Sequence, residues 1–301
     1  MLTKSIGTLS ADIYNVLTDN NDYRHDTVEE ATVFAERLIH QYDKAVGNET
    51  RTREDKVLYA TDIGKPCVRQ TYYSMTASDE AEPIQGHARY KFLYGDLIEE
   101  ITLELAKAAG HMVSNEQTRY ILERNGWQIR GRCDAIIDGH MCDVKSASKY
   151  AFNKYSKEGI SEHNDTFGYR EQLLFYTLMA LENEDIKDTH VGSFFVFVSK
   201  ELGHIVCVKN DLNRVEFYDT LDYKIETLDT ALADEVAPAR VANPTEDHSY
   251  GNTRLGVTCS YCPFKVKCWP ELRAFAYAHG PVFMPEVVKE PPKVPEIDLQ
   301  K

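Results

Sequence analysis

A short stretch in the middle of the chain places two carboxylates and a lysine on neighbouring predicted strands. Asp134 ends the motif Gly131-x-x-Asp134, and Asp143-Val144-Lys145 follows after an Asp-Gly turn signal. Side chains alternate in direction along a strand, so Asp143 and Lys145 emerge on the same face. Paired acids can hold a hard divalent cation, and a lysine beside them stabilises negative charge that develops on a phosphate. The stretch therefore predicts a site for metal-dependent phosphodiester hydrolysis.

Length and hydropathy limit the class of protein. With 301 residues, of which 43% are hydrophobic, the chain can bury one large core with a small appendage. The longest strongly apolar stretch, 194–198, is far too short to span a bilayer. The first five residues lack the apolar segment of a signal peptide. We therefore expect no membrane partner and a location in the cytoplasm of a bacterial or phage-infected cell.

The charge balance argues against a nucleic-acid partner, because DNA-binding proteins usually display basic surface. The net charge is −14. The basic residues are uneven, however, since the stretch 145–157 holds four lysines and no acid. A local basic edge beside an acidic metal site is compatible with an acidic whole, and it predicts salt-sensitive DNA binding.

The same basic stretch interleaves lysines with aromatic rings, a pattern suited to gripping a single strand by phosphate contact and base stacking. The candidate nucleic-acid contacts are Lys149, Tyr150, Lys154, Tyr155, Lys157 and, further along the chain, Tyr169. An amphipathic helix that buries Phe152 and Tyr155 accounts for the pattern equally well. Both interpretations remain open at the level of sequence.

Four of the seven cysteines form a candidate metal site. Cys259, Cys262 and Cys268 have the spacing C-x2-C-x5-C, and Cys67 lies in a turn-rich segment that can present a fourth thiolate. Closing a loop of roughly 190 residues would remove about 4–5 kcal/mol of chain entropy from the unfolded state. Such a site would be structural, and the spacing does not separate zinc from an iron–sulphur cluster.

The rest of the chain predicts an α/β domain, with a central mixed sheet flanked by helices. We expect three parts: a helical N-terminal extension over 1–60, a nuclease-type domain over 61–280 and a flexible proline-rich tail over 281–301. Within the first part, Thr27 opens a helix through a capping box. Helices are predicted at 90–109, 169–181 and 212–232, strands at 119–123, 127–137, 141–145, 191–198 and 205–208, and a loop at 237–257.

These motifs resemble a known family. Gly131-x-x-Asp134, Asp143-x-Lys145 and Gln172-x-x-x-Tyr176 are similar to the motifs of PD-(D/E)xK nucleases of the RecB-like branch. One cysteine before these motifs and C-x2-C-x5-C after them resemble the iron–sulphur members. Those members include AddB-type nuclease domains, RecB-like nucleases associated with CRISPR arrays, and bacteriophage exonucleases. The resemblance covers roughly residues 60–275.

The resemblance implies a restriction-endonuclease-like core and a role for each matching position. Glu99, Asp134, Asp143 and the Val144 carbonyl would hold Mg²⁺ or Mn²⁺, with Glu99 standing where many relatives carry a histidine. Lys145 would orient the attacking water and stabilise the phosphate. Two further side chains would contact the nucleic-acid backbone or support the lysine, and they are Gln172 and Tyr176.

The implied activity is a DNA nuclease, and more narrowly an exonuclease, with a [4Fe–4S] cluster bound by Cys67, Cys259, Cys262 and Cys268. Zinc is the alternative at the cysteines. Implied partners are single-stranded DNA or duplex ends, a helicase or a recombination or replication protein, and further copies of the same chain. The rival hypothesis is a non-catalytic adaptor, stapled by zinc or a cluster, that binds DNA ends or a partner protein.

Overall fold

The structure is a computed structural model that describes residues 4–18, 27–47, 53–187, 192–211, 213–291 and 293–299. The predicted starts of a strand at Val191 and of a helix at Leu212 lie outside these ranges. No helix among the described residues is long and apolar enough to cross a membrane.

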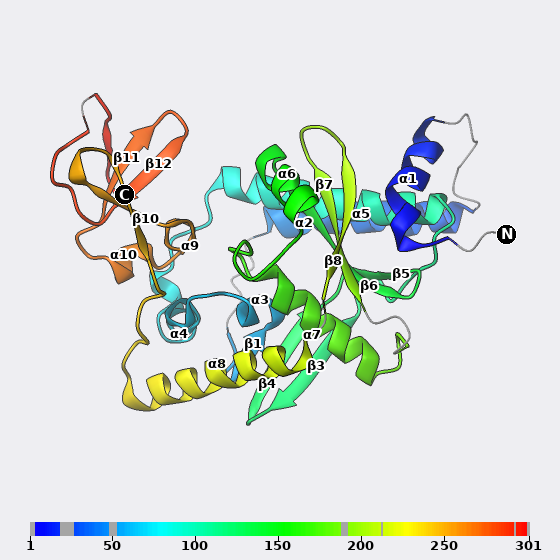
Figure 1. Ribbon diagram of the computed structural model, residues 1–301, viewed down its shortest axis with the longest axis horizontal. Coiled ribbons are helices and arrows are strands. Elements are labelled where there is room, and N and C mark those ends of the chain that lie inside the picture. The colour runs from blue at the N-terminus through cyan, green and yellow to red at the C-terminus, as the bar shows by residue number, and fades with distance from the viewer. Residues whose placement is uncertain are drawn as a thin grey trace.

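A five-stranded mixed sheet forms the centre of the protein (Figure 1). Its strand order is β2-β5-β6-β7-β8, with β6 and β7 parallel and the other neighbours antiparallel. The strands are β2 (Val113–Ser114), β5 (Ala135–Ile137), β6 (His140–Ala147), β7 (Ser193–Ser199) and β8 (Ile205–Asn210). The predicted mixed sheet is therefore confirmed, and β6 lies at its middle.

Helices cover both faces of this sheet, because alternate side chains of β6 and β7 enter two separate cores. One core packs Cys142, Val144 and Val196 against α1 (Leu9–Thr18) and α5 (Gly86–Ala108). The other packs Phe195 and Phe197 against α6 (Lys149–Glu158) and α7 (Tyr169–Glu182). Beyond these lie α2 (Val28–Val46), which packs on α5, and α8 (Arg214–Asp234). The capping box at Thr27 is present at the start of α2.

A smaller sheet, ordered β1-β4-β3, lies beside the central one. It contains β1 (Val57–Tyr59), β3 (Arg119–Arg124) and β4 (Trp127–Arg132). The predicted single strand over 127–137 is wrong, because the chain leaves β4 after Arg132 and enters the other sheet as β5. The interruption falls at Cys133 and Asp134. Two short helices, α3 (Ala60–Ile63) and α4 (Val68–Thr76), follow β1.

The C-terminal region contains more strands than the sequence predicts. The expected loop over 237–257 includes the antiparallel pair β9 (Thr245–Asp247) and β10 (Thr253–Leu255). The expected flexible tail also pairs, because β11 (Arg273–Tyr277) bonds to β12 (Gly280–Met284) and to β13 (Glu296–Ile297). The physical reason is a local core of Phe275, Val282 and Met284. Between the two groups lie α9 (Val257–Ser260) and α10 (Lys265–Cys268).

Candidate active site

Asp134 occupies the break between β4 and β5, where the chain changes sheets. Its Oδ2 accepts a 2.7 Å hydrogen bond from the backbone N–H of Val144 on β6. Ala135 pairs with Cys142 in the β5–β6 ladder, so continuing that register brings Asp134 opposite Asp143. The sheet change thus directs one acid toward the central strand that carries the other.

Asp143 and Lys145 leave β6 on the same face, as predicted. Asp143 is 1% exposed, and its Oδ2 lies 2.5 Å from the Lys145 ammonium. Its Oδ1 has no hydrogen-bond partner among the described residues. The ammonium also lies 5.3 Å from the centre of the Tyr169 ring, at the start of α7. Asp143 therefore keeps one buried acceptor for a further donor or cation.

Glu99 approaches from α5, where its Oε1 accepts a 2.7 Å hydrogen bond from Gln117 Nε2. Burial raises the pKa of Glu99 to about 7, the positive charge of Lys145 lowers it, and the negative charge of Asp143 raises it further. The predicted register of this helix therefore places Glu99 within electrostatic reach of the strand residues.

Burial and neighbouring negative charge disfavour the charged forms of these carboxylates. Burial raises the pKa of Asp134 well above its usual range, and the charges of Glu99 and Asp143 add to the effect. Burial likewise raises the pKa of Asp143, with Lys145 opposing the shift. Burial lowers the pKa of Lys145, but Asp143 and Asp134 outweigh it and raise the pKa overall. One ammonium thus faces three acids, an imbalance that favours a bound cation.

The side chains do not form a complete metal shell as they stand. Across the described ranges, no three His, Cys, Asp or Glu side chains are arranged to hold a metal ion. The donor chemistry still fits a hard divalent cation, because it consists of carboxylate oxygens and includes the unpartnered Oδ1 of Asp143.

Gln172 and Tyr176 lie one turn apart on α7, and Gln172 Nε2 donates a 3.1 Å hydrogen bond to Tyr176 Oη. Tyr176 is buried, and its ring approaches Gly131 so closely that a β-carbon there would lie 2.5 Å from it. Tyr176 therefore supports the strand before Asp134, and within the described part of the chain its hydroxyl is hydrogen-bonded to Gln172 alone.

The positioning roles of two residues, Gln117 and Gly131, were not predicted from the sequence. Gln117 orients Glu99, and no spacing rule links the two residues because they lie on a loop and a helix. Gly131 belongs to the predicted motif, but the structure gives it a packing role. Because it has no side chain, the rings of Phe175 and Tyr176 on α7 can pack against its backbone. An unexplained glycine next to a strand end is the signal that points to such close packing.

The basic stretch forms α6. One of its tyrosines is buried, as expected for an amphipathic helix, and the other is exposed, as a contact with nucleic acid would require. Tyr155 is buried and stacks on Phe197 with ring centres 4.7 Å apart, so its predicted contact with nucleic acid is wrong. Tyr150 is 79% exposed. Lys154 donates a 2.9 Å hydrogen bond to the Asn164 carbonyl. The remaining two lysines, which are exposed, are Lys149 and Lys157.

The structure brings together the four predicted cysteine ligands. Cys67 precedes α4, and the triplet spans α9 and α10, yet all four line one small cavity of ≈20 Å³. Burial raises the pKa of both Cys259 and Cys262 to about 11, and the other cysteines of the group contribute. Arg240 Nε lies 3.4 Å from Cys268 Sγ. Four sulphur donors suit a soft metal, whose positive charge would offset these raised values.

A mixed sheet whose central strand carries a buried aspartate and a lysine, with two further carboxylates close by, defines a nuclease-type α/β protein. The chain belongs to the PD-(D/E)XK nuclease superfamily, whose family pattern matches residues 25–269. The search of curated proteins found no match.

Solved structures with a similar arrangement include the crystal structure of SSO0001, at 15% identity and a TM-score of 0.45 over 81% of this chain and 98% of that one. Another is an alkaline exonuclease, LHK-Exo, from Laribacter hongkongensis. It has 12% identity and a TM-score of 0.37, over 68% of this chain and 95% of its own.

Proposed function

We propose that this protein is a DNA nuclease that depends on a divalent metal and digests strands from their ends. The observation that carries the proposal is the grouping of the buried Asp143 and the half-buried Glu99 and Asp134 around the ammonium of Lys145. Buried acids without matching positive charge are costly unless they bind a cation. Membership of the nuclease superfamily makes a phosphodiester the natural substrate class.

Each side chain has a role in the proposed reaction. Glu99, Asp134, Asp143 and the Val144 carbonyl would hold Mg²⁺ or Mn²⁺, and the metal would supply Lewis acidity and a lowered pKa for bound water. Lys145 holds a positive charge beside the phosphate and stabilises the negative charge that builds on it. The 2.5 Å contact with Asp143 keeps the ammonium on this face of β6.

Exonuclease action is the narrower part of the proposal, and it follows the iron–sulphur nucleases that the motifs resemble. We further propose that Cys67, Cys259, Cys262 and Cys268 hold a [4Fe–4S] cluster, with zinc as the alternative metal. Either would fasten α4 to the C-terminal segment that carries the triplet. A helicase, a recombination or replication protein, or further copies of the chain are the proposed partners.

The deciding experiment is digestion of end-labelled linear and circular DNA, single- and double-stranded, by anaerobically purified protein with and without Mg²⁺ or Mn²⁺. We expect metal-dependent release of nucleotides from linear DNA only. The variant Asp143→Asn should abolish release, whereas Asp211→Asn, at an exposed position, should leave it intact. Cleavage that persists in Asp143→Asn would refute the site, and cleavage of circles would refute the exonuclease mode.

A further inference from the structure

A second polar cavity lies outside the acidic cluster, beside α3 and α4. Its volume is ≈270 Å³. Cationic and hydroxyl side chains dominate the polar part of its lining: Arg53, Lys65, Tyr59, Thr71, Ser74 and Ser78. Such donors, and few acceptors, are what a phosphate requires.

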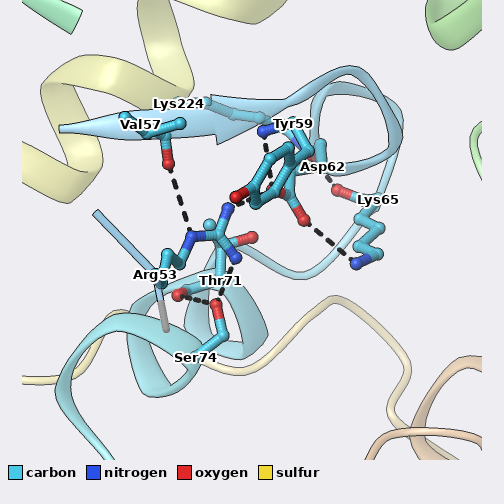
Figure 2. Close-up of polar contacts among 8 residues, drawn as sticks. All are labelled: Arg53, Val57, Tyr59, Asp62, Lys65, Thr71, Ser74 and Lys224. Carbon is cyan, nitrogen blue, oxygen red and sulfur yellow. Dashed lines mark hydrogen bonds and ion pairs between the residues drawn. The ribbon is translucent and has the colours of Figure 1, made fainter. Parts of the chain in front are cut away.

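A single buried carboxylate orders the cations of this cavity, as Figure 2 shows. Asp62 is 2% exposed and forms ion pairs with Arg53 and, at 3.0 Å, with Lys65. Its Oδ2 also accepts a 3.0 Å hydrogen bond from the backbone N–H of Tyr59. Although burial raises the pKa of Asp62, the charges of Lys65 and Arg53 outweigh it and lower the pKa. Two cations thus share one acid, which leaves an excess of positive charge.

A third cation reinforces this excess from behind the cavity wall. Lys224 on α8 is 6% exposed, and its Nζ donates hydrogen bonds to the backbone carbonyls of Asp62, at 2.8 Å, and Lys65. Burial lowers the pKa of Lys224 to about 8, while Asp62 and Glu171 oppose the shift. It is therefore mostly charged at pH 7, and its ammonium fixes the loop that carries Lys65.

The two cations that line the cavity, Arg53 and Lys65, differ in exposure and in the number of their partners within the protein. Arg53 is nearly buried and donates to Asp62, to Ser74 Oγ at 2.6 Å and to the Val57 carbonyl at 3.3 Å. Lys65 has a side chain that is 34% exposed, and Asp62 is its one ion-pair partner among the described residues. Lys65 can therefore turn to a ligand while Arg53 continues to neutralise the buried acid.

The cavity also lies between elements of the two candidate sites. Gln70 and Phe264 line both this cavity and the one that holds the four cysteines. Gly64, the residue before Lys65, packs directly against Gly168, the residue before α7. A ligand in the cavity would thus contact residues that also line the cysteine cavity, and Lys65 lies next in sequence to the residue that packs against the start of α7.

We propose that this cavity binds a phosphate group of the nucleic-acid strand on which the protein acts. The identity of the strand rests on the proposed function, whereas the recognition of phosphate rests on the cavity alone. The volume suits a phosphate with its attached sugar and is below the usual range for larger ligands. Lysine and arginine supply the charge, and the hydroxyls of Thr71, Ser74 and Ser78 offer further donors.

The test compares Lys65→Gln with Lys209→Gln, a matched control in which an exposed lysine also loses one acidic partner. Binding of a labelled oligonucleotide is measured in EDTA over a range of salt, so that cleavage is not required. We expect Lys65→Gln to weaken binding about tenfold and to reduce the salt slope by about one, as for one lost phosphate contact. Lys65→Arg and Lys209→Gln should bind like the unmodified protein. An unchanged affinity and slope in Lys65→Gln would overturn the proposal.

Inorganic phosphate provides the second readout, because it should raise the melting temperature of the unmodified protein and Lys209→Gln but not of Lys65→Gln. It should also compete with the oligonucleotide, and phosphate that binds without competing would mean a free anion and would overturn the proposal. Oligonucleotides with a phosphate or a hydroxyl at each end, and circular single strands, distinguish a terminal phosphate from a backbone phosphate. If the unmodified protein binds DNA through Lys65 but cleaves nothing, the proposed function fails while the cavity assignment stands.

Discussion

Asp143 Oδ2 and Lys145 Nζ lie 2.5 Å apart on the central strand of the sheet. The carboxylates of Glu99 and Asp134 lie close enough to interact electrostatically with this group of side chains. Among the described residues, the pair with Lys145 is the one ion pair of Asp143. A bound cation would have to share Asp143 with this ammonium, so the lysine and the metal are linked through one carboxylate.

Replacing Asp143 by asparagine should separate activity from stability. We expect cleavage to fall by at least about 10²-fold, since the proposed metal ligand and its charge are lost. The melting temperature of the metal-free protein should stay level or rise, because the raised pKa means that the buried charge opposes folding at neutral pH. Nuclease assays and thermal melts measure the two effects. A large loss of stability with activity retained would contradict the assignment.

The raised pKa of Glu99 predicts a pH dependence of stability in the absence of metal. Between its ordinary value of 4.5 and about 7, the folded state binds more protons than the unfolded state, so stability falls as pH rises through this window. The contribution is on the order of 3 kcal/mol. Denaturant titrations from pH 4.5 to 8 should show the fall, and Glu99→Gln should flatten it.

Metal binding should show the opposite pH trend, because Mg²⁺ or Mn²⁺ needs the deprotonated acid. We expect the metal to raise the melting temperature more at pH 8 than at pH 6. An equal effect at both values would mean that Glu99 does not ligate the metal.

Gly131→Ala should destabilise the fold without touching the acidic cluster directly. A β-carbon at this position would lie 2.5 Å from the Tyr176 ring and 2.7 Å from the Ala60 β-carbon. Overpacking of this kind costs about 1–3 kcal/mol. Gly86→Ala is the matched control, since nothing lies within 4 Å of its added β-carbon. Equal stability of the two variants, measured by urea unfolding, would contradict the packing argument.

Two tyrosines of α6 should respond in opposite ways to truncation. Tyr155→Ala should cost about 3–5 kcal/mol of stability, because a large buried ring that stacks on Phe197 is lost. Tyr150→Ala should leave stability unchanged and weaken binding of single-stranded DNA by about 1–3 kcal/mol if its exposed ring stacks on a base. Urea unfolding and binding titrations distinguish these outcomes, and wild-type binding by Tyr150→Ala would exclude α6 as a stacking surface.

Removing one of the proposed cysteine ligands should destabilise the whole chain. We expect Cys67→Ala to lose the bound metal and about 4–5 kcal/mol of stability, the chain entropy of the closed loop. Cys207→Ala, outside the cysteine cavity, should retain the metal. Metal analysis and the visible spectrum of anaerobic protein measure the loss and distinguish iron and sulphide from zinc. Protein that carries neither metal would refute the cysteine site.

The sequence by itself determined the features that follow from local periodicity. The alternation of a strand put Asp143 and Lys145 on one face, and the helical turn put Gln172 next to Tyr176. The C-x2-C-x5-C spacing likewise grouped its three thiols. The mixed sheet could be predicted because buried strands and amphipathic helices differ in their periods.

Only the tertiary structure decided what depends on contacts between distant segments. The chain changes sheets at Asp134, Gln117 orients Glu99, and the proline-rich C-terminal segment pairs as strands. The polar network around Asp62 joins residues of β1, α3, α4 and α8. Lys224 on α8 lies 162 positions after Asp62 in the sequence. No local pattern encodes such contacts, because their stability comes from burial and charge compensation that exist only after the segments have packed.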